Sequence, residues 1–340
     1  MVIVLSILAI GQSCSKYNEA IPLEFDAHKP KIGTPEYYEA LRSYKKSDHA
    51  ICFGWWGQSG TPDAGPNMSG RYEGLPDSMD IVSLWGGFPP MGSEAWNEMQ
   101  VVRKKKGTKF VWCMFGSGVA RLMKKNTPEL LPQEKSKWVK ADIFKAIDFV
   151  AQAMNDTIEK YQLDGFDLDY EPSEADERDE VFGNDGLGTV NGGKESIQYL
   201  FKALSKYLGP KSNTDKVLLI DGYYELGILD YIDFYVQQAY SSTSFQALES
   251  RLTSFGKNEV PPEKFVVTEN MQQFGPKGTT FNVNGVNIGS ILGMATWNST
   301  KGRKGGFGGY IIEQDALSNP SMGLYYYLRM GIQIQNPAPY

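Results

Sequence analysis

Four acidic residues lie within a short, otherwise apolar stretch, LDGFDLDYEP at positions 163–172. They are Asp164, Asp167, Asp169 and Glu171. On an extended strand alternate side chains share a face, so Asp167, Asp169 and Glu171 should project to one side, about 6.6–7 Å apart. Like charges this close in a poorly solvated place do not all ionise, so at least one proton should be held at neutral pH. A carboxyl group that stays protonated near pH 7 is what a general acid requires.

Two other interpretations of these acids are open. Carboxylates at alternate positions also occur in calcium-binding loops, but an EF-hand frame that starts at Asp167 requires glycine at position 172 and glutamate at position 178. The chain has Pro172 and Arg178 there. A purely structural cluster is disfavoured because burying unpaired charge is costly. We therefore expect no metal and no cofactor.

Eight apolar runs predict the β-strands that must position these acids. They span 50–56, 80–88, 109–116, 163–171, 216–224, 232–240, 264–270 and 308–315. Helical patterns follow most of them, and this alternation is typical of a single (β/α)₈ TIM barrel of the α/β class. The acids would then point into the barrel, with Glu171 nearest the open end. The long connection 57–79 follows the first strand, so it should lie at the same end and contact substrate.

The beginning of the chain differs from the rest. MVIVLSILAIGQSC, residues 1–14, is an apolar run too short to span a bilayer. It resembles a bacterial lipoprotein signal, which implies lipidation of Cys14; a buried N-terminal strand is the alternative. Residues 15–33 are predicted to form a tether, and the barrel domain should occupy 34–340, beginning with Thr34 as a helix N-cap. We expect an exported monomer in the cell envelope, at the outer membrane or cell surface, that contacts membrane only through this anchor.

Composition excludes several classes of function. The chain has 34 basic and 40 acidic residues and a net charge of −6, and it lacks a dense basic stripe, so nucleic acid is not an expected partner. Its two histidines, His28 and His49, both precede the first predicted strand. A histidine-based triad or a multi-histidine zinc site is therefore hard to assemble. Cys52 and Cys113 fall within strand-like runs and should be buried free thiols.

The four acids match the DxxDxDxE signature, and on these residues the chain resembles glycoside hydrolase family 18, the chitinases and endo-β-N-acetylglucosaminidases. The resemblance implies retaining hydrolysis assisted by the substrate. Glu171 would protonate the glycosidic oxygen while the 2-acetamido oxygen of the substrate attacks C1. Asp169 would orient that acetamide, and Asp167 behind it would share a proton. No carboxylate would act as the nucleophile.

The sixth predicted strand contains FYVQQAY, in which Gln238 and Tyr240 stand two residues apart. The pair resembles the Gln-x-Tyr of some endo-β-N-acetylglucosaminidases, whereas chitinases more often carry Met-x-Tyr-Asp. This resemblance implies that Tyr240 donates a hydrogen bond to the acetamide and that Gln238 fixes its neighbours. The alternative is that Tyr240 only caps a layer of the barrel.

Further residues are expected to contact a GlcNAc-containing glycan carried by a glycoprotein. They are Asp164 from the signature, Trp55, Trp56 and Trp85 near the ends of the first two strands, and Tyr310 on the eighth. The expected reaction is cleavage of the GlcNAc-β1,4-GlcNAc core of N-glycans. A chitinase acting on linear GlcNAc polymers is one alternative, and a surface glycan-binding protein that no longer turns over is the other.

Overall fold

The computed structural model describes residues 32–57, 67–174, 181–183, 193–224, 227–255 and 260–337. Cys14, the predicted signal, nearly all of the predicted tether and part of the 57–79 connection lie outside these ranges, so the predictions made for them stay predictions. The chain separates into two compact units, residues 1–40 and 41–340. Helix α1 (Pro35–Lys45) begins as expected, because the Thr34 hydroxyl accepts a hydrogen bond from the Tyr37 N–H at 3.2 Å.

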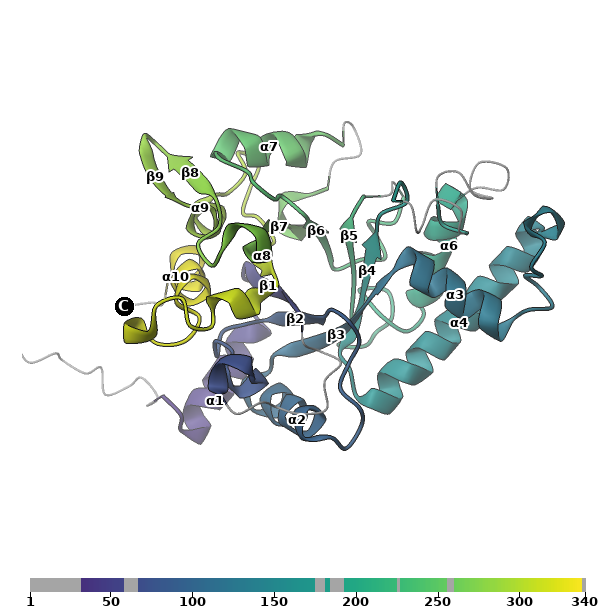
Figure 1. Cartoon of the computed structure of the whole chain (residues 1–340), viewed down its shortest axis with the longest axis horizontal. Helices are drawn as coiled ribbons and strands as arrows, with labels where there is room; N and C mark the ends of the chain where they lie inside the picture. The colour runs from purple at the N-terminus through teal and green to yellow at the C-terminus, as the bar shows by residue number, and fades with distance from the viewer. Residues whose placement is uncertain are drawn as a thin grey trace, which may run out of the picture. The chain divides into compact units, whose positions relative to one another are not determined.

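Eight parallel strands close into a barrel, which confirms the (β/α)₈ prediction (Figure 1). In barrel order they neighbour one another as β1, β2, β3, β4, β5, β6, β7 and β10, and β10 pairs back to β1. Their bounds are β1 (Ile51–Trp56), β2 (Ile81–Leu84), β3 (Lys109–Phe115), β4 (Gly165–Tyr170), β5 (Val217–Gly222), β6 (Phe234–Gln237), β7 (Phe265–Asn270) and β10 (Gly306–Tyr310). Each overlaps one of the predicted runs. The eighth strand ends early, because residues Ile312–Asp315 form a 3₁₀ helix.

Helices follow the strands, as Figure 1 shows for α4, α6 and their neighbours. Their bounds are α2 (Glu94–Lys106), α3 (Gly116–Asn126), α4 (Lys140–Tyr161), α6 (Gly193–Leu204), α7 (Phe245–Thr253), α8 (Met271–Phe274), α9 (Ser290–Thr296) and α10 (Tyr326–Gln335). Helix α2 is typical of the local rules: Ser93 caps its start, four basic residues occupy its last turn, and Gly107 ends it at φ 73°. None of the described helices combines the length and hydrophobicity that a membrane span requires.

Two apolar layers separate the inside of the barrel from its outside. One cluster fills the lumen and includes Phe53, Trp55, Val111 and Leu219. The larger cluster lies between strands and helices and includes Phe166, Leu168 and Tyr170 of β4. The predicted alternation along β4 is therefore confirmed. Asp167 and Asp169 lie on the lumen side of the strand, opposite those three residues.

Two features were not predicted. An antiparallel hairpin, β8 (Thr280–Val283) and β9 (Val286–Gly289), lies between α8 and α9 and packs against α9. The connection after β1 contains two 3₁₀ helices, Met68–Gly70 and Tyr72–Gly74, in its described part. The second of these carries Tyr72, whose ring lies 5.2 Å from that of Trp56. This segment therefore packs against the outer layer of the barrel.

Candidate active site

The fourth strand delivers its acids to the C-terminal end of the barrel. Gly165 has a φ of 153°, and a Cβ on it would lie 2.1 Å from the carbonyl oxygen of Val217, so only glycine allows β4 to begin there. Asp167 and Asp169 are buried in the lumen, with 0% and 3% exposure. Glu171 follows the strand end and is half-buried. The strand thus presents two buried acids beneath one that reaches the opening.

Asp167 lies deepest and is held by two donors. The Trp55 indole N–H donates to its Oδ2 at 3.1 Å, and the Ser83 hydroxyl donates to the same oxygen at 2.6 Å. Burial raises the pKa of Asp167 to about 6, against the opposing effect of hydrogen bonds that include these two. Asp167 therefore exchanges its proton nearer to neutral pH than an ordinary aspartate does.

A fourth acid, Asp221, completes the cluster. It lies on β5 directly opposite Asp169 in the strand register and is fully buried. Burial, followed by the charges of Asp169 and Asp167, raises its pKa well above the ordinary value, so Asp221 holds its proton more tightly than an ordinary aspartate. The sequence analysis missed this residue.

Gln238 joins Asp221 to Glu171. Its side-chain Nε2 donates to Asp221 Oδ1 at 3.0 Å and to Glu171 Oε1 at 3.1 Å. Strand β6 ends at Gln237, so Gln238 and Tyr240 lie in the turn after the strand rather than on it as predicted. Both nevertheless reach the acids. One amide therefore couples the half-buried carboxylate to the buried cluster.

A cavity of about 220 Å³ opens above the buried acids. Its lining residues are Trp55, Trp85, Phe115, Asp169, Glu171, Gln238, Tyr240 and Tyr310. Seven of these were predicted site residues, and Phe115 was not. Asp167 does not line the cavity but contacts its floor through Trp55. The structure thus brings together eight of the ten predicted residues, although their roles stay predictions.

Aromatic rings and phenols form the rest of the wall. The Trp85 ring meets those of Phe115 and Tyr310 edge-on, with centroids 5.0 and 5.6 Å apart. Burial, followed by the charges of Asp221 and Asp169, raises the pKa of Tyr240 well above its ordinary value. Tyr240 is therefore a neutral phenol that can donate a hydrogen bond. Flat apolar faces beside buried donors and acceptors suit a sugar ring with a polar substituent.

The backbone after Tyr240 is held by residues of two elements, α7 and β7. Arg251 on α7 donates through Nη2 to the Tyr240 carbonyl oxygen at 3.3 Å. Glu269 on β7 is fully buried and accepts hydrogen bonds from the Ser241 N–H at 3.0 Å and the Ser290 hydroxyl at 2.6 Å. Both contacts hold the peptide that joins Tyr240 to Ser241, so they fix the backbone directly after Tyr240.

Two predicted substrate contacts are wrong. Asp164 precedes β4 and lies at the opposite, N-terminal end of the barrel, where its Oδ2 accepts hydrogen bonds from Arg103 Nε at 2.6 Å and the Phe110 N–H at 3.0 Å. Trp56 is buried in the outer layer between strands and helices, because it neighbours the inward-facing Trp55 and successive side chains of a strand alternate. Neither lines the cavity.

We expect an Asp164→Ala variant to destabilise the barrel without affecting catalysis. The Phe110 N–H and the Arg103 guanidinium lose their acceptor, which should lower the free energy of unfolding by about 1–3 kcal/mol. Chemical denaturation measures this loss, and kcat at a temperature where both proteins are folded should be unchanged. A drop in kcat in a fully folded variant would show that Asp164 contributes to catalysis after all.

Cys113, Asp167 and Asp221 offer potential metal-ligand atoms within 4.8 Å of one another. Burial raises the pKa of the Cys113 thiol and of both carboxyl groups. Metal ligands must be deprotonated, and these three groups hold their protons more tightly than usual. Their raised pKa values favour proton sharing within this cluster.

Comparison with known proteins agrees with this geometry. Residues 19–334 match the sequence model described as glycoside hydrolase family 18, BT1044-like. Endo-beta-N-acetylglucosaminidase F2 of Elizabethkingia meningoseptica is 26% identical over 331 residues, which cover 89% of this chain and 86% of that protein. A solved structure of a glutamate-to-glutamine variant of BT1044 has a TM-score of 0.72 at 26% identity and covers 91% of this chain and 94% of its own. An endo-beta-N-acetylglucosaminidase from Cordyceps militaris shares the fold, with a TM-score of 0.62 at 21% identity, over 91% of this chain and 98% of its own.

Proposed function

Because this chain belongs to glycoside hydrolase family 18, we propose that it is an endo-β-N-acetylglucosaminidase that cleaves the GlcNAc-β1,4-GlcNAc core of N-linked glycans. The observation that carries the proposal is the single cavity that collects Asp169, Glu171, Gln238 and Tyr240 above the buried Asp167 and Asp221. That set contains a proton donor, a group to orient an acetamide and a neutral phenol. It contains what retaining hydrolysis assisted by the substrate needs.

In the proposed reaction Glu171 gives its proton to the glycosidic oxygen as that bond breaks. The acetamido oxygen of the same GlcNAc attacks C1 and forms an oxazolinium ion. Asp169 accepts a hydrogen bond from the acetamide nitrogen and offsets its positive charge, while Tyr240 donates to the acetamide oxygen. Glu171 then removes a proton from the water that opens the ring, so the anomeric configuration is retained.

An N-glycan is favoured over chitin for two reasons. Gln238, the first residue of the Gln-x-Tyr pair, donates hydrogen bonds to both Glu171 and Asp221 and so connects the two acids. In addition, the relative from Elizabethkingia meningoseptica that covers most of this chain is named an endo-beta-N-acetylglucosaminidase. Both support a site that acts on the chitobiose core of a branched glycan.

The test is the mass of the products from a panel of glycoproteins and chitin oligomers. We expect glycoproteins to retain a single GlcNAc on asparagine and to release a glycan with one GlcNAc at its reducing end. Release of chitobiose from chitin oligomers without action on glycoproteins would select a chitinase instead. Tight glycan binding without any product would indicate a binding protein, and would remove the proposed activity.

A further inference from the structure

The turn that follows β6 places Tyr240 in the wall of the active-site cavity. It is a β-turn, because the Ser242 N–H donates to the Ala239 carbonyl oxygen at 3.2 Å across Tyr240 and Ser241. Ser241 has a φ of 57°, whereas Tyr240 does not have a positive φ. This pattern is typical of a type II turn, whose third residue is usually glycine. A serine at that position is strained, so other contacts must hold the turn in this shape.

The position of the Tyr240 phenol depends on this backbone. Its ring lies 6.5 Å from that of Tyr310, measured between centroids. The hydrogen bond that Tyr240 makes within the described ranges comes from its carbonyl oxygen, and the hydroxyl has no partner among the described residues. The hydroxyl is therefore available to a ligand in the cavity, and the turn sets where it points.

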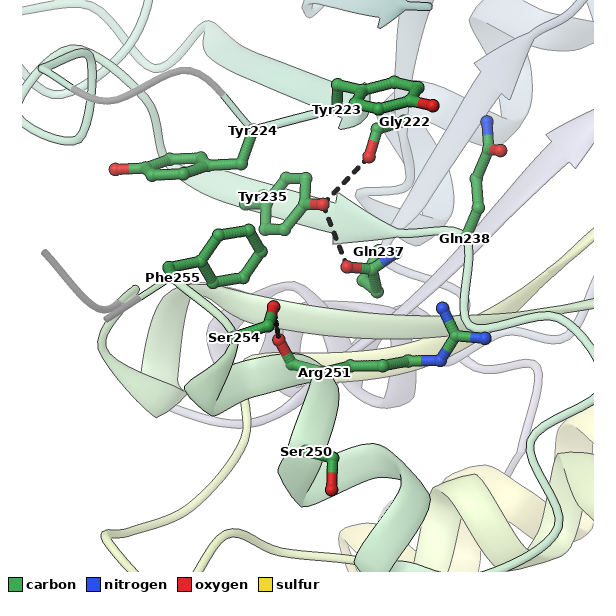
Figure 2. A pocket seen from close by; sticks show the side chains of 10 residues that line it. All are labelled: Gly222, Tyr223, Tyr224, Tyr235, Gln237, Gln238, Ser250, Arg251, Ser254 and Phe255. Atoms are coloured by element: carbon green, nitrogen blue, oxygen red, sulfur yellow. Dashed lines mark hydrogen bonds between the residues drawn. The ribbon is translucent and has the colours of Figure 1, made fainter.

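Two charged residues hold the Tyr240–Ser241 peptide at its opposite ends. Arg251 extends from α7 toward the chain after Gln238 (Figure 2), and its Nη2 donates to the Tyr240 carbonyl oxygen at 3.3 Å. From β7, Glu269 Oε1 accepts a hydrogen bond from the Ser241 N–H at 3.0 Å. The peptide thus lies between a cation at its oxygen and an acid at its N–H. Hydrogen bonds to charged groups are roughly twice as strong as those between neutral groups.

Glu269 is a rigid end for this clamp. It is fully buried, and besides the Ser241 N–H its oxygens accept from the Asn270 N–H at 2.8 Å and from the Ser290 hydroxyl at 2.6 Å. Three donors and no acceptor among its described partners fit the ionised form of the side chain, which only accepts. Hydrogen bonds of this kind compensate the cost of burying a charge. Glu269 is therefore anchored by β7 and α9 as well as by the turn.

Arg251 has no other acid to bind. Its Nε donates to the Ser242 hydroxyl at 3.2 Å, and it pairs with no carboxylate within the described ranges. Both of its side-chain hydrogen bonds are therefore made to the turn. It also lines an outer cavity of about 490 Å³ between β6 and α7 (Figure 2), so the space beside it can admit a different side chain at this position.

We propose that Arg251 and Glu269 are positioning residues for Tyr240, which clamp the peptide after it so that its phenol meets the acetamide oxygen of the substrate. The inference rests on the proposed function, because the contact between Tyr240 and the acetamide belongs to that mechanism. Neither Arg251 nor Glu269 lines the active-site cavity. Their effect on the reaction should therefore pass through the Tyr240 hydroxyl.

A double-mutant cycle tests this route. Tyr240→Phe removes the hydroxyl and sets the largest loss that the clamp can cause. Arg251→Met and Glu269→Gln should each lower kcat on an N-glycosylated peptide roughly three- to tenfold, as expected when one hydrogen bond is misplaced. In the Tyr240→Phe background neither change should lower kcat further. Equal losses in both backgrounds would show that the two residues act on the enzyme as a whole and would overturn the inference, as would full activity of both single variants.

A conservative variant and a matched control complete the cycle. Arg251→Lys keeps the positive charge and a donor, so it should lose less activity than Arg251→Met, and it takes the place of that variant in the cycle if Arg251→Met fails to fold. A loss as large as that of Arg251→Met would show that the charge does not hold the turn. Arg329→Met is the control and should be fully active, because Arg329 is exposed on α10, donates to the Met322 carbonyl oxygen and lines neither cavity. Thermal unfolding checks that each variant is folded.

The clamp can also be tested without activity. If the wild type cleaves no glycan, the proposed function fails, and crystal structures of the wild type and of Arg251→Met still show whether the clamp sets the position of Tyr240. We expect Ser241 to leave the left-handed region in the variant and the Tyr240 ring to move out of the cavity wall. An unchanged turn with Tyr240 in place would overturn the inference.

Discussion

A Glu171→Gln variant should lose about 10²–10⁴-fold in kcat on glycopeptides, because a glutamine cannot donate a proton to the leaving oxygen. The amide keeps the size of the side chain and a partner for Gln238, so folding and substrate binding should be preserved. KM should therefore change little. Steady-state kinetics with product mass as the readout measures both parameters, and thermal unfolding checks that the variant is folded.

A control variant and a second substrate make this prediction specific. Glu174→Gln alters an exposed carboxyl group three residues after Glu171 and should retain full activity. An aryl glycoside whose phenolate leaves without protonation should be cleaved by Glu171→Gln with a much smaller loss than the glycopeptide. Equal losses on the two substrates would show that Glu171 does not act as the proton donor.

The sequence predicted the barrel because its signals are local and redundant. Each strand run is short, apolar and bounded by polar residues, and the connectivity follows from the chirality of parallel strand crossovers. The hairpin β8–β9 was missed although Asn284 and Gly285, both at positive φ, form a recognisable turn dipeptide. Its strands are only four residues long and the exposed side chains of β9 give little apolar pattern.

The two wrong site predictions, Asp164 and Trp56, did not take the geometry of an extended strand into account. Asp164 stands seven residues before Glu171, which at about 3.3 Å per residue puts them roughly 23 Å apart along an extended chain. One sugar cannot contact both. Trp55 and Trp56 are adjacent, so only one of them can face the lumen of a barrel. Both corrections follow from the strand geometry that correctly placed Asp167 and Asp169.

Asp221 was harder to find because its importance depends on contacts between strands. In the sequence it is one acid after an apolar run, at the end of β5. It becomes part of the site through two tertiary contacts. The strand register places it beside Asp169, and the turn after β6 brings Gln238 into contact with it. One signal was available: Val217, Leu219 and Asp221 alternate, which puts the acid on the lumen face near the open end.

We expect Asp221→Leu to lower kcat by about 10²-fold, the second largest effect among these predictions. Leucine removes the acceptor for Gln238, which then no longer holds Glu171, and it removes the carboxyl group that faces the charge of Asp169. Folding is checked by thermal unfolding. If a folded Asp221→Leu variant retains full activity, the acid network is not needed for the reaction.

Asp221→Asn distinguishes a role in catalysis from one in packing through its pH dependence. While Asp221 holds its proton it is neutral, so asparagine mimics it, with an oxygen for Gln238 and an N–H for Asp169. As pH rises through the elevated pKa of Asp221, the wild type gains a negative charge beside Asp169 and Asp167 and should lose activity. Asparagine cannot ionise, so the variant should match the wild type below the pKa of Asp221 and retain activity to higher pH than the wild type. Superimposable pH profiles of kcat would show that ionisation of Asp221 does not limit the enzyme, and would restrict its part to holding Gln238 in place.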